Sequence, residues 1–437
     1  MSYVLPFAGI RYATDRQADV SALLSPPYDV LSETDKQALL ARSPDNFVLV
    51  DLPHTPPKHA GPPEVYERAN RQLQDWLSRG RMLRDPAPAI YVYYQAYTHA
   101  GRAHVRKMFF ARLRLEPFGE GSVFPHEQTF GGPKEDRLAL MKATAATLSP
   151  IFGLYPDPEN TVAARLAAAI GPSPLAYGTL DAVENRLWAV TDPKVISEVQ
   201  ALMASRPTFI ADGHHRYGTA MLYRDWLAQR EGPLPADHPA NHVMCVFCAM
   251  EDPGLLILPT HRVVPGVAFP PASLKGDTDV EIAHLPADGA DDVPVRLEKF
   301  GPQAVGLFSA APGAGEGFYV LRPWKETLLD GVCPERSAAW RRLGLAFLHT
   351  WLLDRVIGRH TRGKAPDLHY VKSASAAVQE ARDTGGCCFL MQRTAEKERG
   401  GGGRSPSAGG GGRTGARPGS PPHDRDLGAR RFHDDPS

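Results

Sequence analysis

The chain has 437 residues, 43% of them hydrophobic and 22% charged, which is too long for one ordinary core and predicts two or three soluble globular domains. Its 49 basic and 49 acidic residues cancel, which argues against a nucleic-acid partner because such proteins need a basic surface. We recognise no bilayer-spanning apolar run and no signal peptide, so we expect no membrane partner, and the five scattered cysteines favour a cytoplasmic location over a disulfide framework.

Residues 1–118 are predicted to form an N-terminal α+β region. Acidic residues directly after Ser32 predict a capped helix, because acids are stabilised near a helix N-terminus. The predicted elements are an extended or turned segment at 25–29, a helix from Ser32, a strand at 46–52, a helix at 62–79 ended by Gly80, and hairpin strands at 90–97 and 105–115.

Residues 119–262 are predicted to form a core region in which helices and strands alternate while hairpins intrude. We therefore expect an α/β to α+β fold with a mixed sheet. The predicted elements are a loop at 119–127, helices at 136–146, 161–170, 193–204 and 214–230, and strands at 149–155, 186–190, 208–211, 243–250 and 255–258.

Residues 263–391 are predicted to form a C-terminal α/β region with little regular structure before residue 337. Apolar residues at helical spacing predict a helix at 337–357, and a short helix capped by Ser375 and a strand at 387–391 follow. Glycine, arginine, proline and serine dominate residues 392–437. This tail cannot bury enough apolar surface to offset the entropy lost on ordering, so we predict that it is disordered.

The most informative segment is Ile-Ala-Asp-Gly-His-His-Arg at residues 210–216, where a strand runs into a helix. The glycine allows a sharp turn and close approach of a ligand, and the first amides of a helix favour phosphate. The predicted phosphate-binding residues are Asp212, Gly213, His214, His215 and Arg216. Alternatively, the aspartate only caps the helix and the histidines are packed or solvated. We predict no metal site here, because adjacent histidines point about 100° apart on a helix.

A second candidate site comprises the Phe-Pro-His-Glu-Gln loop at 124–128 and the charged helix start at 134–137. A glutamate in such a loop could take a proton from an attacking hydroxyl. Taken alone, each segment is more typical of a solvated surface, and the two gain meaning only together. The candidates are Glu127, His126 and Asp136 as catalytic groups, Asp136 or Glu135 beside Mg²⁺, and Lys134 or Arg137 beside phosphate.

Seven short motifs, taken in order, carry a resemblance to a known family. They lie at 6–7, 25–30, 125–127, 134–138, 149–152, 210–217 and 258–261. With these motifs the chain resembles the bacterial and archaeal family called domain of unknown function 1015, over roughly residues 5–390. That resemblance implies no stated activity.

The Pro-His-Glu-Gln loop followed by Asp-Gly-His-His-Arg also resembles the free serine kinases of the ParB/sulfiredoxin superfamily. The resemblance implies a ParB/sulfiredoxin-like nucleotide-binding core and transfer of a phosphoryl group from ATP or ADP, with Mg²⁺, to a small hydroxyl metabolite. L-serine is the leading acceptor. It also implies that Glu127 is the general base and that residues 212–216 hold the nucleotide phosphates. Glu135 or Asp136 is nearest to the second acid of those kinases, at a different spacing.

The C-terminus departs from both families, which usually carry a Pro-x-Lys-Ser/Thr-Thr/Tyr segment there. This chain becomes rich in glycine, arginine and proline instead. We hypothesise that the reading frame shifts near Met391. Translation of the other frames tests the idea, which fails if none restores a lysine-serine/threonine segment followed by an apolar tail.

Two other functions stay open on the sequence alone. One is a nucleotide-binding regulator, as ParB proteins are, which binds or slowly hydrolyses nucleotide without a phosphorylated product. A DNA-binding version is disfavoured because no helix-turn-helix signature or basic stripe is recognisable outside the tail. The other is an unrelated enzyme that uses the same anion-binding turn, for example a phosphatase working in reverse on phosphoserine.

Overall fold

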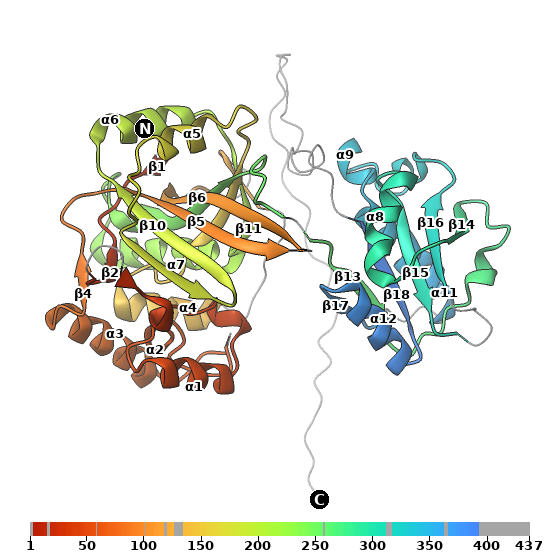
Figure 1. Ribbon diagram of the computed structural model, residues 1–437, viewed down its shortest axis with the longest axis horizontal. Coiled ribbons are helices and arrows are strands. Elements are labelled where there is room, and N and C mark those ends of the chain that lie inside the picture. Colours follow the sequence, from red (N-terminus) through yellow and green to blue (C-terminus); the bar gives the residue numbers. More distant parts are fainter. Residues whose placement is uncertain are drawn as a thin grey trace, which may run out of the picture. The chain divides into compact units, whose positions relative to one another are not determined.

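The computed structural model describes residues 3–14, 18–57, 59–99, 101–117, 120–125, 134–256, 258–311, 317–361 and 366–392. Within these ranges the strands form a ten-stranded mixed sheet, a six-stranded antiparallel sheet and a two-stranded sheet (Figure 1). The predicted α/β to α+β class with a mixed sheet is confirmed. In the same ranges, every helix is too short or too polar to cross a membrane.

The ten-stranded sheet lies in the N-terminal part of the chain, and its order is β3-β9-β10-β5-β6-β12-β8-β11-β7, with β1 on β6. Its strands come from both the predicted N-terminal region, residues 1–118, and the predicted core region, residues 119–262. The hairpin of β5 (Ile90–His99) and β6 (Arg102–Arg114) is confirmed and is longer than predicted. The other strands are β1 (Val4–Leu5), β3 (Ala18–Asp19), β7 (Val123–Phe124), β8 (Ile151–Tyr155), β9 (Ala176–Leu180), β10 (Val183–Val190), β11 (Thr208–Asp212) and β12 (His242–Ala249).

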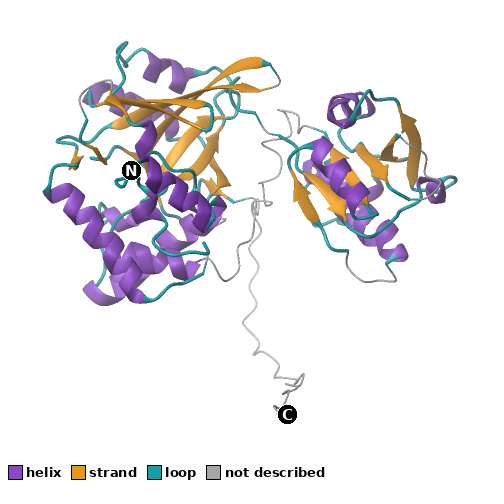
Figure 2. Cartoon of the chain, turned by 60° about the horizontal axis from the view of Figure 1, so that its bottom comes forward, coloured by secondary structure: helices purple, strands orange, loops and turns teal. Residues whose placement is uncertain are grey.

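Helices cover this sheet and form a second layer with their own core (Figure 2). The helix start after Ser32 is confirmed as a capping box, in which the Ser32 side chain and Asp35 exchange hydrogen bonds with each other's backbone amides. Helix α4 contacts both α3 and α7. The helices are α1 (Glu33–Arg42), α2 (Val48–Asp51), α3 (Pro63–Ser78), α4 (Lys134–Thr144), α5 (Thr161–Ala167), α6 (Pro193–Met203) and α7 (His214–Glu231). The two-stranded sheet pairs β2 (Ile10–Tyr12) with β4 (Met82–Arg84).

The predicted strand at 46–52 is wrong, because this stretch forms helix α2. Its branched residues favour a strand locally, but the buried side chain of Asn46 decides otherwise. Its amide nitrogen donates to Ala22 O and Leu24 O at 2.9 and 2.8 Å, and its Oδ1 accepts from Val48 N at 3.0 Å. One side chain therefore both binds a distant segment and contacts the first residue of α2.

The strand predicted at 255–258 is also wrong within the described residues, since Leu255, Leu256 and Leu258 are irregular. Asp252 accepts from Gly254 N at 2.8 Å and closes a turn. The turn packs flat against β6, where a Cβ on Gly254 would lie 2.2 Å from Val105 O. The chain then continues into a different sheet.

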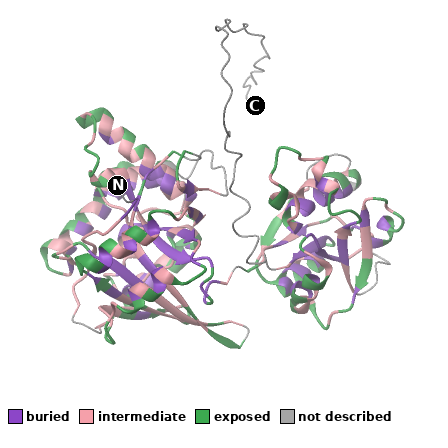
Figure 3. Cartoon of the chain, turned by 90° about the horizontal axis from the view of Figure 1, so that it is seen from above, coloured by how far each residue is buried: buried purple, intermediate pink, exposed green. Residues whose placement is uncertain are grey.

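The C-terminal part contains far more regular structure than predicted between residues 258 and 337. Its six-stranded sheet has the order β14-β16-β15-β18-β13-β17. The inner strands β15 and β18 are fully buried, whereas the edge strand β17 is mostly exposed (Figure 3). Prolines and glycines between the short strands mask the pattern in the sequence. The strands are β13 (His261–Val264), β14 (Val280–Leu285), β15 (Val305–Ser309), β16 (Phe318–Pro323), β17 (His369–Val371) and the predicted β18 (Cys387–Met391).

The helix predicted at 337–357 is interrupted. Leu343 is extended, and Gly344 N donates to Pro302 O at 3.0 Å, which breaks the helix before the apolar run continues as a π-helix. The segments are α9 (Ala338–Arg341), α10 (Gly344–Phe347), the π-helix η8 (Leu348–Ile357) and α11 (Gly358–His360), and the remaining helices are α8 (Val293–Leu297) and α12 (Ala374–Asp383). Ser373, not Ser375, caps α12, with Ala376 N donating to its hydroxyl at 3.3 Å. The predicted disordered tail lies outside the described residues from 393 onward.

His261 links β13, which comes first along the chain in this sheet, to β18, which comes last. The side chain is 1% exposed, and its Nδ1 accepts from Met391 N at 3.0 Å, so the ring is held in its neutral form. Burial, with the nearby Arg262, lowers the pKa of His261 to about 4.

We predict that His261→Asn makes the stability of the C-terminal part less sensitive to acid. The unfolded chain takes up a proton on His261 near pH 6.5, whereas the folded chain resists protonation until about pH 4. This histidine therefore contributes stability above pH 6.5 that is lost as the pH falls toward 4, by at most about 3 kcal/mol. Asparagine keeps an acceptor but never titrates. Urea unfolding at pH 7 and pH 4.5 should show a smaller drop than in the wild type, whereas the surface variant His59→Asn should show the wild-type drop.

Candidate functional site

The turn between β11 and α7 has the predicted strand-turn-helix geometry. Gly213 has φ of +89° and lies at the N-terminus of α7. A Cβ there would lie 3.1 Å from Arg216 Cζ, so both the backbone conformation and the space favour glycine. Tyr217 anchors the first turn of α7, because its hydroxyl donates to Glu116 O and accepts from Glu116 N, both at 2.8 Å.

The two histidines of the turn differ in their surroundings. His214 is buried, with 4% of its surface exposed. His215 is half-buried, and its Nδ1 atom is enclosed without a hydrogen-bond partner in the part of the chain that the structure describes. A buried nitrogen without a partner costs free energy, so a ligand that satisfied it would be stabilised.

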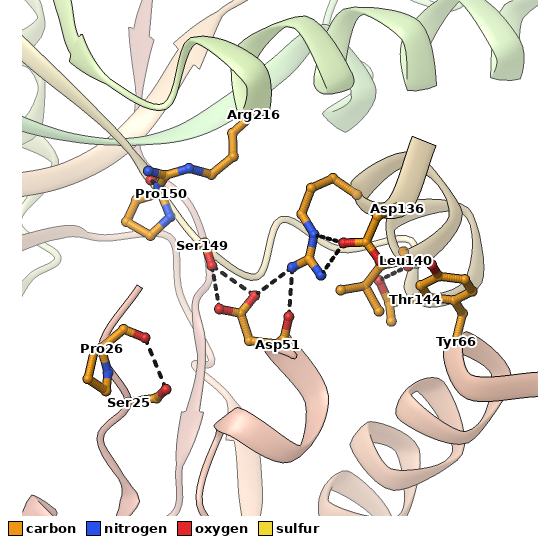
Figure 4. A network of polar contacts seen from close by, with 11 residues as sticks. Ser25, Pro26, Asp51, Tyr66, Asp136, Leu140, Thr144, Ser149, Pro150 and Arg216 are labelled. Carbon is orange, nitrogen blue, oxygen red and sulfur yellow. Dashed lines mark hydrogen bonds and ion pairs between the residues drawn. The ribbon is translucent and has the colours of Figure 1, made fainter. Parts of the chain in front are cut away.

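Arg216 spans the end of β11 and the start of β8, two strands that run antiparallel. Its guanidinium donates to Pro150 O (Figure 4). It also donates to the carboxylate of Asp212. The Arg216 side chain is 14% exposed and the Asp212 side chain is 63% exposed. An ion pair with one partner mostly in water contributes little stability. Asp212 can therefore release Arg216 to another anion at low cost.

Arg137, at the start of α4, lies in a buried network of ion pairs. Its Nε donates to Asp136 Oδ2 at 2.8 Å and its Nη2 lies 2.7 Å from the same oxygen. Its Nη1 donates to Asp51 O at 2.6 Å and lies 3.5 Å from Asp51 Oδ1. The guanidinium also stacks on the Tyr28 ring, 3.9 Å from the centroid. Since Tyr66 OH donates to Asp136 Oδ1 at 2.8 Å, both oxygens of Asp136 are engaged.

Asp51 connects this network to the segment before β8. Ser149 Oγ lies 2.7 and 2.8 Å from the two Asp51 carboxylate oxygens and donates to them (Figure 4). Burial raises the pKa of Asp51, although Arg137 and the Ser149 hydroxyl oppose the shift. Ser149 immediately precedes Pro150, so one short segment contacts both Asp51 and Arg216.

A small pocket lies between α4, α7 and this segment. Arg137, Arg216, Asp51 and Ser149 line it together with apolar side chains, and its volume is about 30 Å³. That is room for a few water-sized groups and far less than the roughly 300 Å³ or more of a typical small-molecule site. It can receive one end of a ligand, and the body of a nucleotide would lie outside it.

Only part of the predicted site lies within the described residues. His126 and Glu127 lie outside them, as does the side chain of Lys134. In the described chain, Arg137 and Arg216 line one pocket, Asp136 is buried beside it, and Asp212 is exposed at its turn. The described His, Cys, Asp and Glu side chains form no group of three placed to hold a metal ion.

Sequence reasoning missed four side chains that complete the arrangement: Tyr28, Asp51, Tyr66 and Ser149. Tyr28 and Ser149 lie in motifs at 25–30 and 149–152 that already carried the family resemblance, so their presence there was an available signal. Asp51 was missed because residues 46–52 were wrongly predicted to form a strand. Tyr66 carried no signal, since it lies in an ordinary amphipathic helix.

Four of the motifs that carry the family resemblance, at 25–30, 134–138, 149–152 and 210–217, contribute residues to this pocket or to the network beside it. The family model described as "Protein of unknown function (DUF1015)" matches residues 4–301, more than half of the chain. The chain belongs to the DUF1015 family. No curated protein and no solved structure matches it. Family membership therefore accounts for the motifs at the pocket without assigning an activity to them.

We predict that Arg137→Met lowers the free energy of unfolding by about 3–5 kcal/mol, because it leaves the buried carboxylates of Asp51 and Asp136 without their cation. Arg71→Met is the matched control, since Arg71 pairs with Glu67 on the surface of α3 with side chains 68% and 64% exposed. It should change stability by less than about 0.5 kcal/mol. Urea unfolding measures both. Equal stability of the two variants would contradict the structural role of Arg137.

Proposed function

We propose that this protein is a nucleotide-dependent small-molecule kinase that transfers a phosphoryl group from ATP or ADP to a hydroxyl group, with L-serine as the leading acceptor. One observation carries the proposal: the strand-to-helix turn at Gly213 and the releasable Arg216 lie beside a small pocket that also contains Arg137, Asp51 and Ser149. The resemblance to the free serine kinases supplies the reaction class and a ParB/sulfiredoxin-like core.

The terminal phosphate would bind at the turn. α7 is an 18-residue helix, and its first amides carry the positive end of the helix dipole. Arg216 would exchange the exposed carboxylate of Asp212 for the phosphate, which it can hold through two parallel hydrogen bonds.

Arg137 and Asp136 act in this proposal as positioning residues. Each is buried and paired with the other, and Asp51 binds Arg137 while Tyr66 binds Asp136. Exchanging such a pair for a ligand would leave a buried charge uncompensated. Their role is to fix α4 beside α7. Lys134 would neutralise phosphate charge from the first position of α4.

Mg²⁺ would accompany the nucleotide and reduce the charge on its phosphates. Mg²⁺ usually keeps several water ligands and takes one or two carboxylates from a protein. Of the two acids suggested by the sequence, Glu135 is exposed, whereas both oxygens of Asp136 are engaged. Glu135 is therefore the better residue to contact the ion or its water shell.

Glu127 would act as the general base. It would take the proton of the acceptor hydroxyl as the hydroxyl oxygen forms a bond to the terminal phosphorus and the bond to the departing nucleotide oxygen breaks. β7 runs parallel to β11, and Pro125 follows β7 while Lys134 begins α4 beside the pocket. The chain therefore leaves the sheet in the direction of the turn before 126–127 and returns at the pocket after them.

Product formation tests the proposal most directly. The full chain is incubated with Mg²⁺, either ATP or ADP, and a panel of hydroxyl metabolites that includes L-serine, and phosphorylated products are identified by mass spectrometry. A new phosphate monoester confirms a kinase and names its acceptor. Measurable nucleotide binding with no product from any acceptor would favour the nucleotide-binding regulator.

We predict that Glu127→Gln abolishes transfer, lowering kcat by about 10²–10⁴-fold, because the amide cannot accept the hydroxyl proton. Nucleotide affinity should stay within about twofold of the wild type, since the base is not a phosphate ligand. Glu120→Gln, at an exposed residue shortly before β7, serves as the control and should keep full activity. Loss of both nucleotide binding and transfer in the Glu127 variant would point to misfolding or to a different role.

We predict that Arg216→Gln weakens nucleotide binding about tenfold or more, because a charge-assisted hydrogen bond is worth about 1.5–3 kcal/mol. Isothermal titration with the nucleotide measures the change. The control is Arg224→Gln, further along α7, where the arginine pairs with the adjacent Asp225. Unchanged nucleotide affinity in the Arg216 variant would remove the turn from the proposed phosphate site.

A further inference from the structure

In the C-terminal part, α8 and α12 lie beside the strands of the sheet (Figure 1). A groove lies where β14, β15 and β16 meet these two helices. Its volume is about 680 Å³, which lies within the roughly 300–1,000 Å³ of small-molecule sites. His284 at the end of β14, Phe308 in β15 and Phe318 in β16 line it, together with Gln379 and Arg382 of α12. None of these residues takes part in the proposed kinase site, so the groove is an independent feature.

Arg382 is the arginine of the groove that stacks on an aromatic ring. Its guanidinium lies over the Phe308 ring, 5.1 Å from the centroid. The described part of the chain provides no carboxylate partner for it, and the residue is exposed. Stacking on a ring fixes the plane of a guanidinium while its N–H groups stay available. Arg382 therefore presents an oriented set of donors to the groove.

The acids around the groove are already engaged. Asp288 and Asp292 both pair with Arg296. Asp291 accepts a hydrogen bond from Ser375 N at 3.1 Å. Within the described residues, none of these carboxylates forms an ion pair with Arg382.

Part of the remaining wall is apolar, although Asp288, Arg296 and Ser375 also line the groove. Phe318 lies 5.9 Å from Phe308 between ring centroids, with the ring planes at 47°. Leu285 and Val378, both buried, complete this side of the groove. An aromatic and aliphatic wall beside one oriented cation is suited to a molecule with an apolar body and an anionic end.

We propose that this groove binds a small organic acid, with its apolar or aromatic body against Phe318 and Val378 and its carboxylate paired with Arg382. The carboxylate replaces the water around the guanidinium with charge-assisted hydrogen bonds. The body covers apolar surface that is otherwise wet. The site takes a class of ligand different from the nucleotide of the proposed kinase.

The test uses 3-(4-fluorophenyl)propanoate as the probe and the full chain as the receptor, with binding followed by ¹⁹F NMR titration. We expect saturable binding, and we expect the neutral analogue 3-(4-fluorophenyl)propan-1-ol to bind about tenfold more weakly because it lacks the charge. Arg382→Gln should weaken the acid about tenfold and leave the alcohol unchanged. Gln379→Trp, which fills the groove, should weaken both.

Arg336→Gln is the matched control. Arg336 is also exposed and stacked on a ring, 5.3 Å from the Trp340 centroid, but it does not line the groove. It should bind the acid as the wild type does, and thermal unfolding checks that all variants are folded. The proposal is overturned if the wild type does not bind the acid at millimolar concentration, or if the Arg382 and Arg336 variants bind it equally well.

Discussion

The N-terminal part depends on the ion pairs and hydrogen bonds of the buried Arg137 guanidinium. It binds Asp136 on its own helix and Asp51 on α2, and it stacks on Tyr28. Two carboxylates and one arginine taken out of water are tolerated only when their geometry and hydrogen bonds compensate for lost solvation. Tyr66 and the Ser149 hydroxyl supply the additional hydrogen bonds. Segments far apart in the chain are thereby held in one arrangement.

This arrangement explains how a pocket forms at the end of the sheet. The antiparallel pair β8 and β11 brings Pro150 next to the turn at Gly213, and Ser149 reaches Asp51 from the same short segment. A rigid scaffold beneath a loop or turn is the usual way in which a fold presents reactive groups. The two arginines can have different roles. The buried, ion-paired Arg137 can fix the structure, whereas the weakly paired Arg216 can exchange partners.

In the C-terminal part, too, polar side chains join strands, and the pairing of its charges differs between neighbouring arginines. Its antiparallel sheet is tied together by His261, whose neutral ring accepts a hydrogen bond from the last strand. Among the described residues no carboxylate pairs with Arg382 in its groove, whereas Arg296 nearby pairs with two. Whether an arginine is paired depends on whether the folded chain brings a carboxylate from another strand end or helix close to it. The contrast between these two arginines could not be derived from their positions in the chain.

Local sequence determined the elements whose signals are strong over a short range. The acidic capping box after Ser32, the long amphipathic helix at 62–79, the hairpin around Gly101 and the turn at Gly213 all follow from propensity, capping and backbone sterics. Residue type alone was also enough to single out Arg216, because glycine followed by donors at a helix start favours an anion.

Tertiary structure decided the features that depend on distant partners. Asn46 turned a strand-like sequence into a helix by binding carbonyls more than twenty residues away, and a contact with Pro302 interrupted the predicted helix at Leu343. The same holds for Asp51 and Ser149, whose meeting joins residues 98 positions apart. The sequence by itself determined where single elements begin and turn. Only the folded chain decided which charges are neutralised and which stay available, because neutralisation depends on distance and burial.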